Sequence, residues 1–248
     1  MRAPATILPL ATQGLGFAAG ATRILSDVTL TIGAGAPTLI IGPNGAGKAV
    51  LLRLLHGLLH PTEGRIRWDG QPGGAERGQA MVFQRPVLLR RSVIANVLYP
   101  LRLAGVTAKQ RAARAEQALA LVGLSALADR PARRLSGGEQ QRLALARAAA
   151  TGAEVLFLDE PCASLDPGAT RAVEEIVARL AAQGTKIVMT THDLGQARRL
   201  AGDVVFLHGG RVLEHAPADA FFAGPSSPEA AAFLRGELLS RPDDREIP

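Results

Sequence analysis

Short runs of almost wholly apolar residues alternate with longer segments along the chain. The runs are Thr38 to Ile41, Ala80 to Phe83, Val155 to Leu158 and Ile187 to Thr190. Strands this continuously apolar are buried on both faces, as in a parallel sheet that helices cover. We therefore expect an α/β fold with parallel strands at its centre.

A second group of segments mixes polar and apolar residues in alternation. It comprises Asp27 to Ile32, Arg65 to Trp68, Val204 to Leu207 and Arg211 to Glu214, and His208-Gly209-Gly210 separates the last two. Alternation is typical of half-exposed strands, and a glycine pair between two of them favours a hairpin. These segments predict antiparallel strands at the edges of the sheet.

Helical segments carry start and stop signals. Thr107 and Gln110 form a capping-box pattern, which predicts an Ala-rich helix that stops near Gly123. Asp166 followed by Pro167 predicts the start of another helix, with the aspartate as its N-cap.

The stretch from Pro86 to Thr151 has a helical pattern throughout and contains no strand signal. It predicts a helical lobe, residues 87–151, inserted in a single domain of residues 1–248. A segment that contains proline and serine, residues 225–248, is expected to form a C-terminal tail.

Composition limits the class of protein. The 248 residues are 47% hydrophobic, enough for a large buried core. No apolar run approaches the ~18 residues of a membrane-spanning helix, and Met1 to Leu10 lacks the pattern of a secretory signal. The single cysteine, Cys162, excludes an internal disulfide and favours a reducing compartment. We therefore expect a cytosolic chain that is at most peripheral to a membrane.

Charge says little about partners. The net charge is +6, and arginines are scattered along the chain, which favours a solvated basic surface over a nucleic-acid-binding one. Only three of the 28 basic residues are lysines, at Lys48, Lys109 and Lys186. Arginine is the usual cation of this chain, so a lysine within a motif indicates a specific requirement.

The most informative local motif follows the first apolar run and precedes a Leu-rich helix, Leu51 to Leu59. This strand–loop–helix setting is typical of a phosphate loop, in which backbone N–H groups surround an anion and a lysine bridges phosphate oxygens. A tight structural turn is the alternative. The residues expected to bind a diphosphate or triphosphate are Gly42, Pro43, Asn44, Gly45, Ala46, Gly47, Lys48, Ala49 and Val50.

One position of this loop departs from the motif. Where the pattern has a serine or threonine, whose hydroxyl binds Mg²⁺, this chain has Ala49. We expect weaker Mg²⁺ coordination with nucleotide binding retained.

The segment Leu135-Ser136-Gly137-Gly138-Glu139-Gln140-Gln141-Arg142 matches the signature of the ATP-binding cassette family, which the chain resembles over nearly its whole length. The resemblance implies that Ser136, Gly137, Gly138 and Glu139, at a helix N-terminus, contact the γ-phosphate of an ATP held by a second subunit. A helix N-cap at Ser136 is the structural interpretation of the same residues.

The apolar run ending in Asp159 and Glu160 resembles the Walker B element of that family. The resemblance implies that Asp159 holds Mg²⁺ and that Glu160 polarises the attacking water or accepts its proton. The segment Ser164 to Pro167, which resembles the family's D-loop, follows closely. Exposed loop carboxylates are the alternative.

Three further residues match positions of the family. Gln84 matches the glutamine expected to sense Mg²⁺ and the attacking water, and His192 matches the histidine expected to hydrogen-bond the γ-phosphate. Phe17 fits the aromatic residue that stacks on adenine, with a core phenylalanine as an equal alternative. The resemblance thus implies catalytic roles for Lys48, Gln84, Glu160 and His192, and metal binding by Gln84 and Asp159.

The sequence gives weaker support to two other candidate sites. His56 and His60 would form a metal-binding pair only if a helix runs through Gly57, and no third ligand is evident. Cys162 lies beside Glu160 but lacks the local signature of a thiol nucleophile. We expect neither a second metal site nor thiol catalysis.

The resemblance also implies an architecture and partners. It implies a P-loop NTPase (RecA-like) core with an antiparallel β edge and an inserted helical lobe. Two copies would hold two ATP molecules head to tail, and the segment Gln84 to Ser92 would pass motion to a separate integral membrane permease. A substrate-binding protein is an indirect partner, and no nucleic acid is expected. The subunit would lie at the cytoplasmic face of a membrane.

The resemblance also suggests which substrate is transported. The segments Gln84 to Ser92, Leu51 to Leu58 and Phe233 to Leu238 resemble those of tungstate importers, near the phosphate and molybdate group. Import of an oxyanion such as tungstate is therefore expected. The alternatives are a non-transport cassette protein, disfavoured by the single motif set, and a slow, regulatory nucleotide-binding module, suggested by Ala49.

Overall fold

The computed structural model describes residues 6–68 and 78–239. The chain forms two compact units, one made of Met1–Arg77 with Lys186–Pro248 and the other of Gly78–Thr185. In the described ranges, no helix is both long enough and apolar enough to cross a membrane. The last part of the expected tail, residues 240–248, lies outside the described residues.

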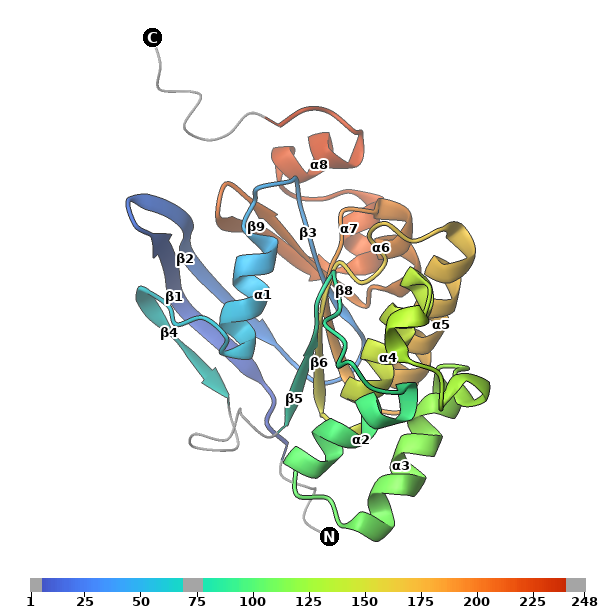
Figure 1. Cartoon of the computed structure of the whole chain (residues 1–248). Coiled ribbons are helices and arrows are strands. Elements are labelled where there is room, and N and C mark those ends of the chain that lie inside the picture. The colour runs from blue at the N-terminus through green and yellow to red at the C-terminus, as the bar shows by residue number, and fades with distance from the viewer. Residues whose placement is uncertain (1–5, 69–77, 240–248) are drawn as a thin grey trace, which may run out of the picture. The chain divides into compact units, whose positions relative to one another are not determined.

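The first unit contains an antiparallel sheet with the strand order β2-β1-β4 (Figure 1). Its strands are β1 at Leu10–Ala19, β2 at Thr22–Ile32 and β4 at Glu63–Trp68. Leu15 of β1 and Leu25 of β2 are fully buried, which shows that one face of this sheet is covered.

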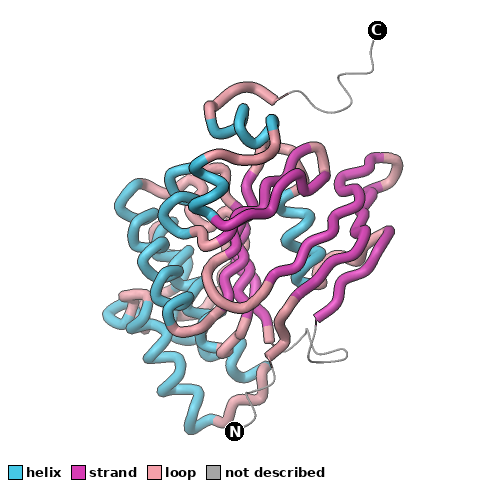
Figure 2. The backbone as a smooth tube through the Cα atoms, turned by 180° about the vertical axis from the view of Figure 1, so that it is seen from behind, coloured by secondary structure: helices cyan, strands magenta, loops and turns pink. Residues whose placement is uncertain are grey.

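The same unit contains a parallel group of strands. β7 (Lys186–Thr190), β3 (Thr38–Ile41) and β8 (Asp203–His208) pair in parallel, and β9 (Arg211–Pro217) returns antiparallel to β8. Figure 2 draws the strands in magenta. Every residue of β3 and β7 is buried, because neighbouring elements cover both faces. The hairpin predicted around the paired glycines is confirmed.

Four helices lie in the described part of the first unit: α1 at Lys48–His56, α6 at Leu194–Leu200, α7 at Ala218–Ala223 and α8 at Pro228–Leu234. The ring centre of Phe206 in β8 lies 6.2 Å from that of Phe221 in α7 and 5.4 Å from that of Phe233 in α8. Aromatic packing therefore attaches both C-terminal helices to β8. Helix α8 falls within the segment expected to be a tail.

The second unit combines two parallel strands with helices. β5 (Gln79–Val82) pairs with β6 (Val155–Asp159). The helices are α2 at Val93–Leu103, α3 at Ala108–Leu121, α4 at Gly137–Ala150 and α5 at Pro167–Ala182, with 3-10 turns at Ser125–Leu127 and Ala132–Arg134. Helices α2, α3 and α4 pack on one another within residues 87–151, and the compact unit also includes β5, β6 and α5.

The two predicted helix starts have different outcomes. Asp166 caps α5, since its Oδ1 accepts a hydrogen bond of 2.8 Å from the N–H of Ala169. Thr107 occupies the N-cap position of α3, but its side chain accepts no backbone hydrogen bond. Its Oγ1 instead donates to Oε1 of Gln110 at 3.2 Å, so the predicted capping box is wrong.

Candidate functional site

A glycine loop joins β3 to α1 in the first unit. Gly42 and Gly47 have φ angles of 149° and 100°, in the region that favours glycine. A Cβ on Gly42 would lie 2.0 Å from the backbone oxygen of Leu207, and a Cβ on Gly47 would lie 2.7 Å from Cδ2 of Leu25. Both positions therefore require glycine, which fits a phosphate loop. At the tip of the loop, Asn44 and Gly45 are exposed, and Ala46 is buried.

Lys48 is the first residue of α1, and it is 6% exposed. Its Nζ donates hydrogen bonds to the carbonyl oxygens of Gly42, at 2.8 Å, and Pro43, at 3.1 Å. The first turn of α1 contains no acidic residue. The ammonium group and the helix N-terminus thus form a positive site suited to phosphate groups.

The next two residues of α1 are Ala49 and Val50, both half-buried. Their side chains carry no oxygen. The loop can therefore offer backbone amides and an ammonium group to a nucleotide, but no hydroxyl to Mg²⁺.

His192 lies at the same sheet edge as this loop. Since β3 and β7 are parallel neighbours, with Ile40 opposite Thr190, the loops that follow them leave the same edge. The N–H of Thr191 donates to the carbonyl oxygen of Ile40 at 3.3 Å. His192 is exposed and precedes Asp193, the N-cap of α6. The structure thus brings His192 and the glycine loop to one edge.

Phe17 lies in β1, opposite Leu25 of β2, and is half-buried. Leu25 is also the residue that a Cβ on Gly47 would meet. Leu25 of β2 therefore lies between Phe17 and the glycine loop. Its stacking on adenine stays a prediction.

Two carboxylates of the second unit lie at the end of β6. Asp159 is the last residue of the strand and is 5% exposed. Glu160 and Ser164 have φ angles of 43° and 67°. Left-handed backbone costs about 1–3 kcal/mol in such residues and clusters at functional sites. The strain marks this segment as a candidate active region, while the metal and proton-transfer roles stay predictions.

Gln84 lies at the same edge as these carboxylates. It follows β5, which runs parallel to β6 with Val82 opposite Leu158, and its side chain is exposed. Gln84, Asp159 and Glu160 are thus brought together at the carboxyl ends of two neighbouring strands.

Ser136 caps α4 in a complete capping box. Its Oγ accepts a hydrogen bond from the N–H of Glu139 at 3.3 Å, and Oε2 of Glu139 accepts one from the N–H of Ser136 at 2.7 Å. The hydrogen bond from the Ser136 backbone is the main cause that lowers the pKa of Glu139. A Cβ on Gly138 would lie 2.7 Å from Cβ of Ala169, while Gly137 is exposed. The helix-cap interpretation is confirmed, and contact with a phosphate of a second subunit stays a prediction.

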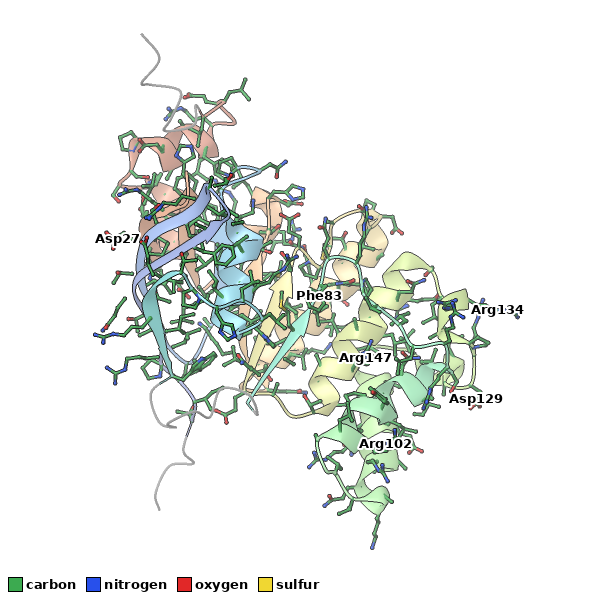
Figure 3. All side chains as sticks on the ribbon, turned by 60° about the vertical axis from the view of Figure 1, so that its left-hand side comes forward. Asp27, Phe83, Arg102, Asp129, Arg134 and Arg147 are labelled. Atoms are coloured by element: carbon green, nitrogen blue, oxygen red, sulfur yellow. The ribbon has the colours of Figure 1, made fainter. Side chains whose placement is uncertain are left out.

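Three side chains hold the segment around Gln84, a role that the sequence did not predict for any of them. Nε2 of Gln141 donates to the carbonyl oxygen of Phe83 at 3.4 Å, and Nη1 of Arg147 donates to that of Val87 at 2.6 Å; Figure 3 labels Phe83 and Arg147. The third is the fully buried Asn96 of α2, which bonds both backbone groups of Leu89. Asn96 could have been recognised from the sequence as a polar residue among the apolar positions of α2.

The two histidines considered as a metal-binding pair, His56 and His60, lie at the end of α1 and beyond it. His56 is the last residue of α1, and Gly57, with a φ of 86°, ends the helix, so His60 does not follow on the same face. Across residues 6–68 and 78–239, no group of three His, Cys, Asp or Glu side chains could hold a metal ion.

Comparison with known proteins identifies the family. The model of the ABC transporter family matches residues 25–163. The methionine import ATP-binding protein MetN of Cereibacter sphaeroides is 41% identical over 86% of this chain, and the match spans 63% of that relative's length. The phosphate import ATP-binding protein PstB 2 of Natronomonas pharaonis is 38% identical over 93% of this chain and 87% of its own. The tungstate uptake system ATP-binding protein TupC of Peptoclostridium acidaminophilum is 40% identical over 82% and 94%.

Two solved structures share the fold. The cbiO1 protein of Clostridium perfringens, part of the ABC transporter complex cbiONQ, matches with a TM-score of 0.79 at 28% identity, covering 87% of this chain and 90% of that one. A dimeric ATP-binding cassette in a post-hydrolysis state, bound to ADP and Pi, matches with a TM-score of 0.74 at 26% identity, covering 84% and 98%. The expected P-loop α/β fold with an antiparallel sheet is confirmed. The chain belongs to the ABC transporter family, and it is an ATP-binding ATPase of that family.

Proposed function

We propose that this chain is the ATP-hydrolysing subunit of an importer and that it works as a head-to-tail dimer with a separate permease at the cytoplasmic face of a membrane. The observation that carries the proposal is the glycine loop, whose backbone conformation and buried Lys48 create a positive site for phosphates. The three relatives described above are each named for import or uptake, and a related cassette is dimeric with ADP and Pi bound.

In the proposed mechanism, the loop amides and Lys48 bind the phosphates of ATP, and Phe17 stacks on adenine. Glu160 polarises the attacking water or accepts its proton, and Gln84 and His192 orient that water. The segment from Ser136 to Glu139 of each copy contacts the γ-phosphate held by the other copy. Nucleotide binding and dimerisation are then one event.

Mg²⁺ would neutralise charge on the phosphates when it is bound, and Asp159 and Gln84 are the residues proposed to hold it. The buried carboxylate of Asp159 fits a cation that proteins bind through phosphates and one or two carboxylates. Ala49 offers no oxygen ligand. We therefore propose that nucleotide binding and dimerisation persist while turnover is slower than a serine or threonine would allow.

We further propose that the imported substrate is an oxyanion such as tungstate, with molybdate and phosphate less favoured. The tungstate and phosphate relatives support an oxyanion, whereas the equally similar methionine relative supports a different cargo. The cargo contacts the permease and its binding protein rather than this subunit. Stimulation of ATPase activity by tungstate in the assembled transporter, with methionine as the comparison, distinguishes these cargoes.

The variant Glu160→Gln tests the proposed function. An amide cannot accept the proton of the attacking water, so the ATPase rate is expected to fall at least about 100-fold. ATP should still bind and hold two copies together, which size-exclusion chromatography with and without ATP measures. Glu116→Gln, at an exposed position of α3, is the matched control. A parental ATPase rate in Glu160→Gln would show that the assignment of Glu160 is wrong.

A further inference from the structure

The signature segment contains two successive glycines, and the structure gives them different surroundings. Gly137 is exposed, and a Cβ on it would lie 4.0 Å from Cδ2 of Leu165, an ordinary contact distance. Gly138 is half-buried, and a Cβ on it would lie 2.7 Å from Cβ of Ala169 in α5. A side chain therefore fits at residue 137 but collides with α5 at residue 138.

Backbone conformation does not explain the glycine at position 138. Gly138 lies in the first turn of α4, where the helical backbone accepts any residue, whereas Gly42 and Gly47 have positive φ angles. Glycine also disfavours a helix relative to alanine, so its presence there needs another reason. The close approach of Ala169 supplies that reason.

The contact lies where the starts of two helices meet. Helices α4 and α5 pack on each other within the second unit, side by side in Figure 1. Carbon atoms in contact lie about 3.5–4.0 Å apart, so a methyl group on residue 138 would push the two helix starts apart by about 1 Å. The contact between Gly138 and Ala169 therefore sets the distance between the start of α4 and the start of α5.

Successive hydrogen bonds connect the start of α5 to Glu160. The N–H of Ala163 donates to the carbonyl oxygen of Glu160 at 3.1 Å. The N–H of Leu165 donates to the carbonyl oxygen of Cys162 at 3.2 Å, and Asp166 then caps α5. Because these bonds hold the segment together, a displacement of the helix start is passed on to Glu160.

We propose that Ala169 is a positioning residue for ATP hydrolysis: its methyl group, packed against Gly138, holds Glu160 at a fixed distance from the signature segment of the same copy. The proposal rests on the proposed function, in which Glu160 acts on the ATP of its own copy and the signature segment contacts the ATP of the other. The contact then links each Glu160 to the nucleotide at the opposite site.

Moving the methyl group across the contact tests the proposal. In Gly138→Ala two methyl groups collide, and the kcat of ATP hydrolysis by the full chain is expected to fall at least tenfold, because a misplacement of about 1 Å is enough for such a loss. Gly138→Ala/Ala169→Gly again has one methyl group at the contact and should recover to within about threefold of the parental kcat. ATP affinity without Mg²⁺ should stay parental in both variants, because the glycine loop is unchanged.

Ala178→Gly is the matched control, since Ala178 is an exposed residue of α5. This substitution also removes a methyl group and lowers helix propensity, but it does not relieve the collision. Gly138→Ala/Ala178→Gly should therefore stay as slow as Gly138→Ala. Thermal melting shows which variants are folded. Ala169→Val enlarges the contact from the other side and should lower kcat in the same way, so it replaces Gly138→Ala if that variant does not fold.

Several results would overturn the proposal. A parental kcat in Gly138→Ala, whatever its melting temperature, would limit the contact to stability. A folded Gly138→Ala/Ala169→Gly that stays slow would show that a side chain at residue 138 obstructs the phosphate instead. Equal recovery with Ala178→Gly would assign the effect to helix flexibility. A parental rate in Glu160→Gln contradicts the proposed function, whereas a parental rate in Gly138→Ala with an inactive Glu160→Gln contradicts only the role of this contact.

Discussion

The start of α1 places an ammonium group and a methyl group next to each other in sequence. Nζ of Lys48 is fixed by two carbonyl oxygens of the loop, whereas the side chain of Ala49 carries no atom that could bind a metal. Anion binding and metal binding therefore depend on different atoms in this chain. The first rests on the glycine backbone and Lys48, and the second is proposed to come from Gln84, Asp159 and the nucleotide itself.

Ala49→Ser separates these two contributions. The added hydroxyl supplies a ligand for Mg²⁺, so half-maximal ATPase activity should require about tenfold less Mg²⁺, with a higher maximal rate. Binding of ATP without Mg²⁺ should not change. A Mg²⁺ titration of ATPase activity and a nucleotide-binding titration measure these effects.

Ala49→Cys is the control, because a cysteine side chain is similar in size to a serine side chain but its thiol has poor affinity for Mg²⁺. An equal effect of cysteine and serine would point to packing rather than to coordination. Unchanged Mg²⁺ dependence in Ala49→Ser would show that another group already supplies the ligand.

At the scale of elements, helix α4 holds the loop that follows β5. Gln141 bonds the carbonyl oxygen of Phe83, on one side of Gln84, and Arg147 bonds that of Val87, on the other. The segment proposed to contact the permease is thus hydrogen-bonded to α4, the helix that Ser136 caps. We expect the loop and α4 to move together.

Arg147→Met should loosen this attachment. Because the loop loses a hydrogen bond from a charged donor, the hydrogen-exchange rates of the amides in residues 84–92 are expected to rise about tenfold. Burial lowers the pKa of Arg147. The ordinary pKa of arginine is so high that the guanidinium group still carries its charge at neutral pH. Arg179→Met removes a similar bond, from Arg179 to the carbonyl oxygen of Glu175, and should leave this loop unchanged. Unaltered exchange in Arg147→Met would contradict the attachment.

Four strands of the first unit are joined by charged and polar side chains around Asp203 at the start of β8. Its carboxylate lies 2.6 Å from Nε2 of His215, 2.8 Å from Oγ1 of Thr38 and 3.7 Å from Nζ of Lys186. Burial raises the pKa of Asp203, but the hydrogen bonds with His215 and Thr38 and the charge of Lys186 outweigh it, so the pKa is lowered.

This cluster predicts a pH dependence of stability. The folded pKa of Asp203 lies below the unfolded value of about 3.9, so ionised Asp203 stabilises the fold above that pH. The contribution is lost as pH falls through the folded pKa. Asp203→Asn should therefore lower the free energy of unfolding at neutral pH and reduce its fall below about pH 4. Urea denaturation at several pH values measures this. Asp129→Asn, at an exposed position, should retain the parental profile.

The elements with strong local signals could be predicted from the sequence. The apolar runs became β3, β5, β6 and β7. Every residue of β3, β6 and β7 is buried, whereas Val82 is the only buried residue of β5. Strand β1 was missed because Gly14 and Gly16 interrupt its alternation, and its register shifts there. A Cβ on Gly64 of β4 would lie 2.2 Å from the backbone oxygen of Gly14, a close approach that no local pattern reveals.

The candidate site likewise contains residues that local sequence features predict and residues that they do not. Lys48, Asp159 and Ser136 could be placed on their elements because loop, strand end and helix cap are local features. Gln141 could not be linked to the loop because its partner, Phe83, is 58 residues away in sequence. Such contacts depend on how helices pack, which periodicity does not specify.

At the scale of the whole molecule, the chain carries one glycine loop and one signature segment in its described ranges. In the proposed head-to-tail dimer, each ATP site takes the loop from one copy and the signature from the other. Two variants that damage different halves should then complement each other.

Mixing Lys48→Met with Gly137→Asp tests this sharing. A Cβ on Gly137 meets only Cδ2 of Leu165, at 4.0 Å, so aspartate fits the fold while its charge repels phosphate. Each variant alone should be inactive. An equal mixture should recover about a quarter of the parental ATPase rate, since half of the dimers are mixed and each has one intact site. Absence of recovery at any ratio would contradict the head-to-tail arrangement.

The capping box of α4 bears on the lifetime of such a dimer. The hydroxyl oxygen of Ser136 accepts a hydrogen bond from the N–H of Glu139, so its own proton can be donated to an anion. One serine then secures both the first turn of its helix and the phosphate of the partner copy. Fraying of that turn would release both bonds together. We therefore expect the dissociation rate of the closed dimer to follow the local unfolding equilibrium of a single helical turn.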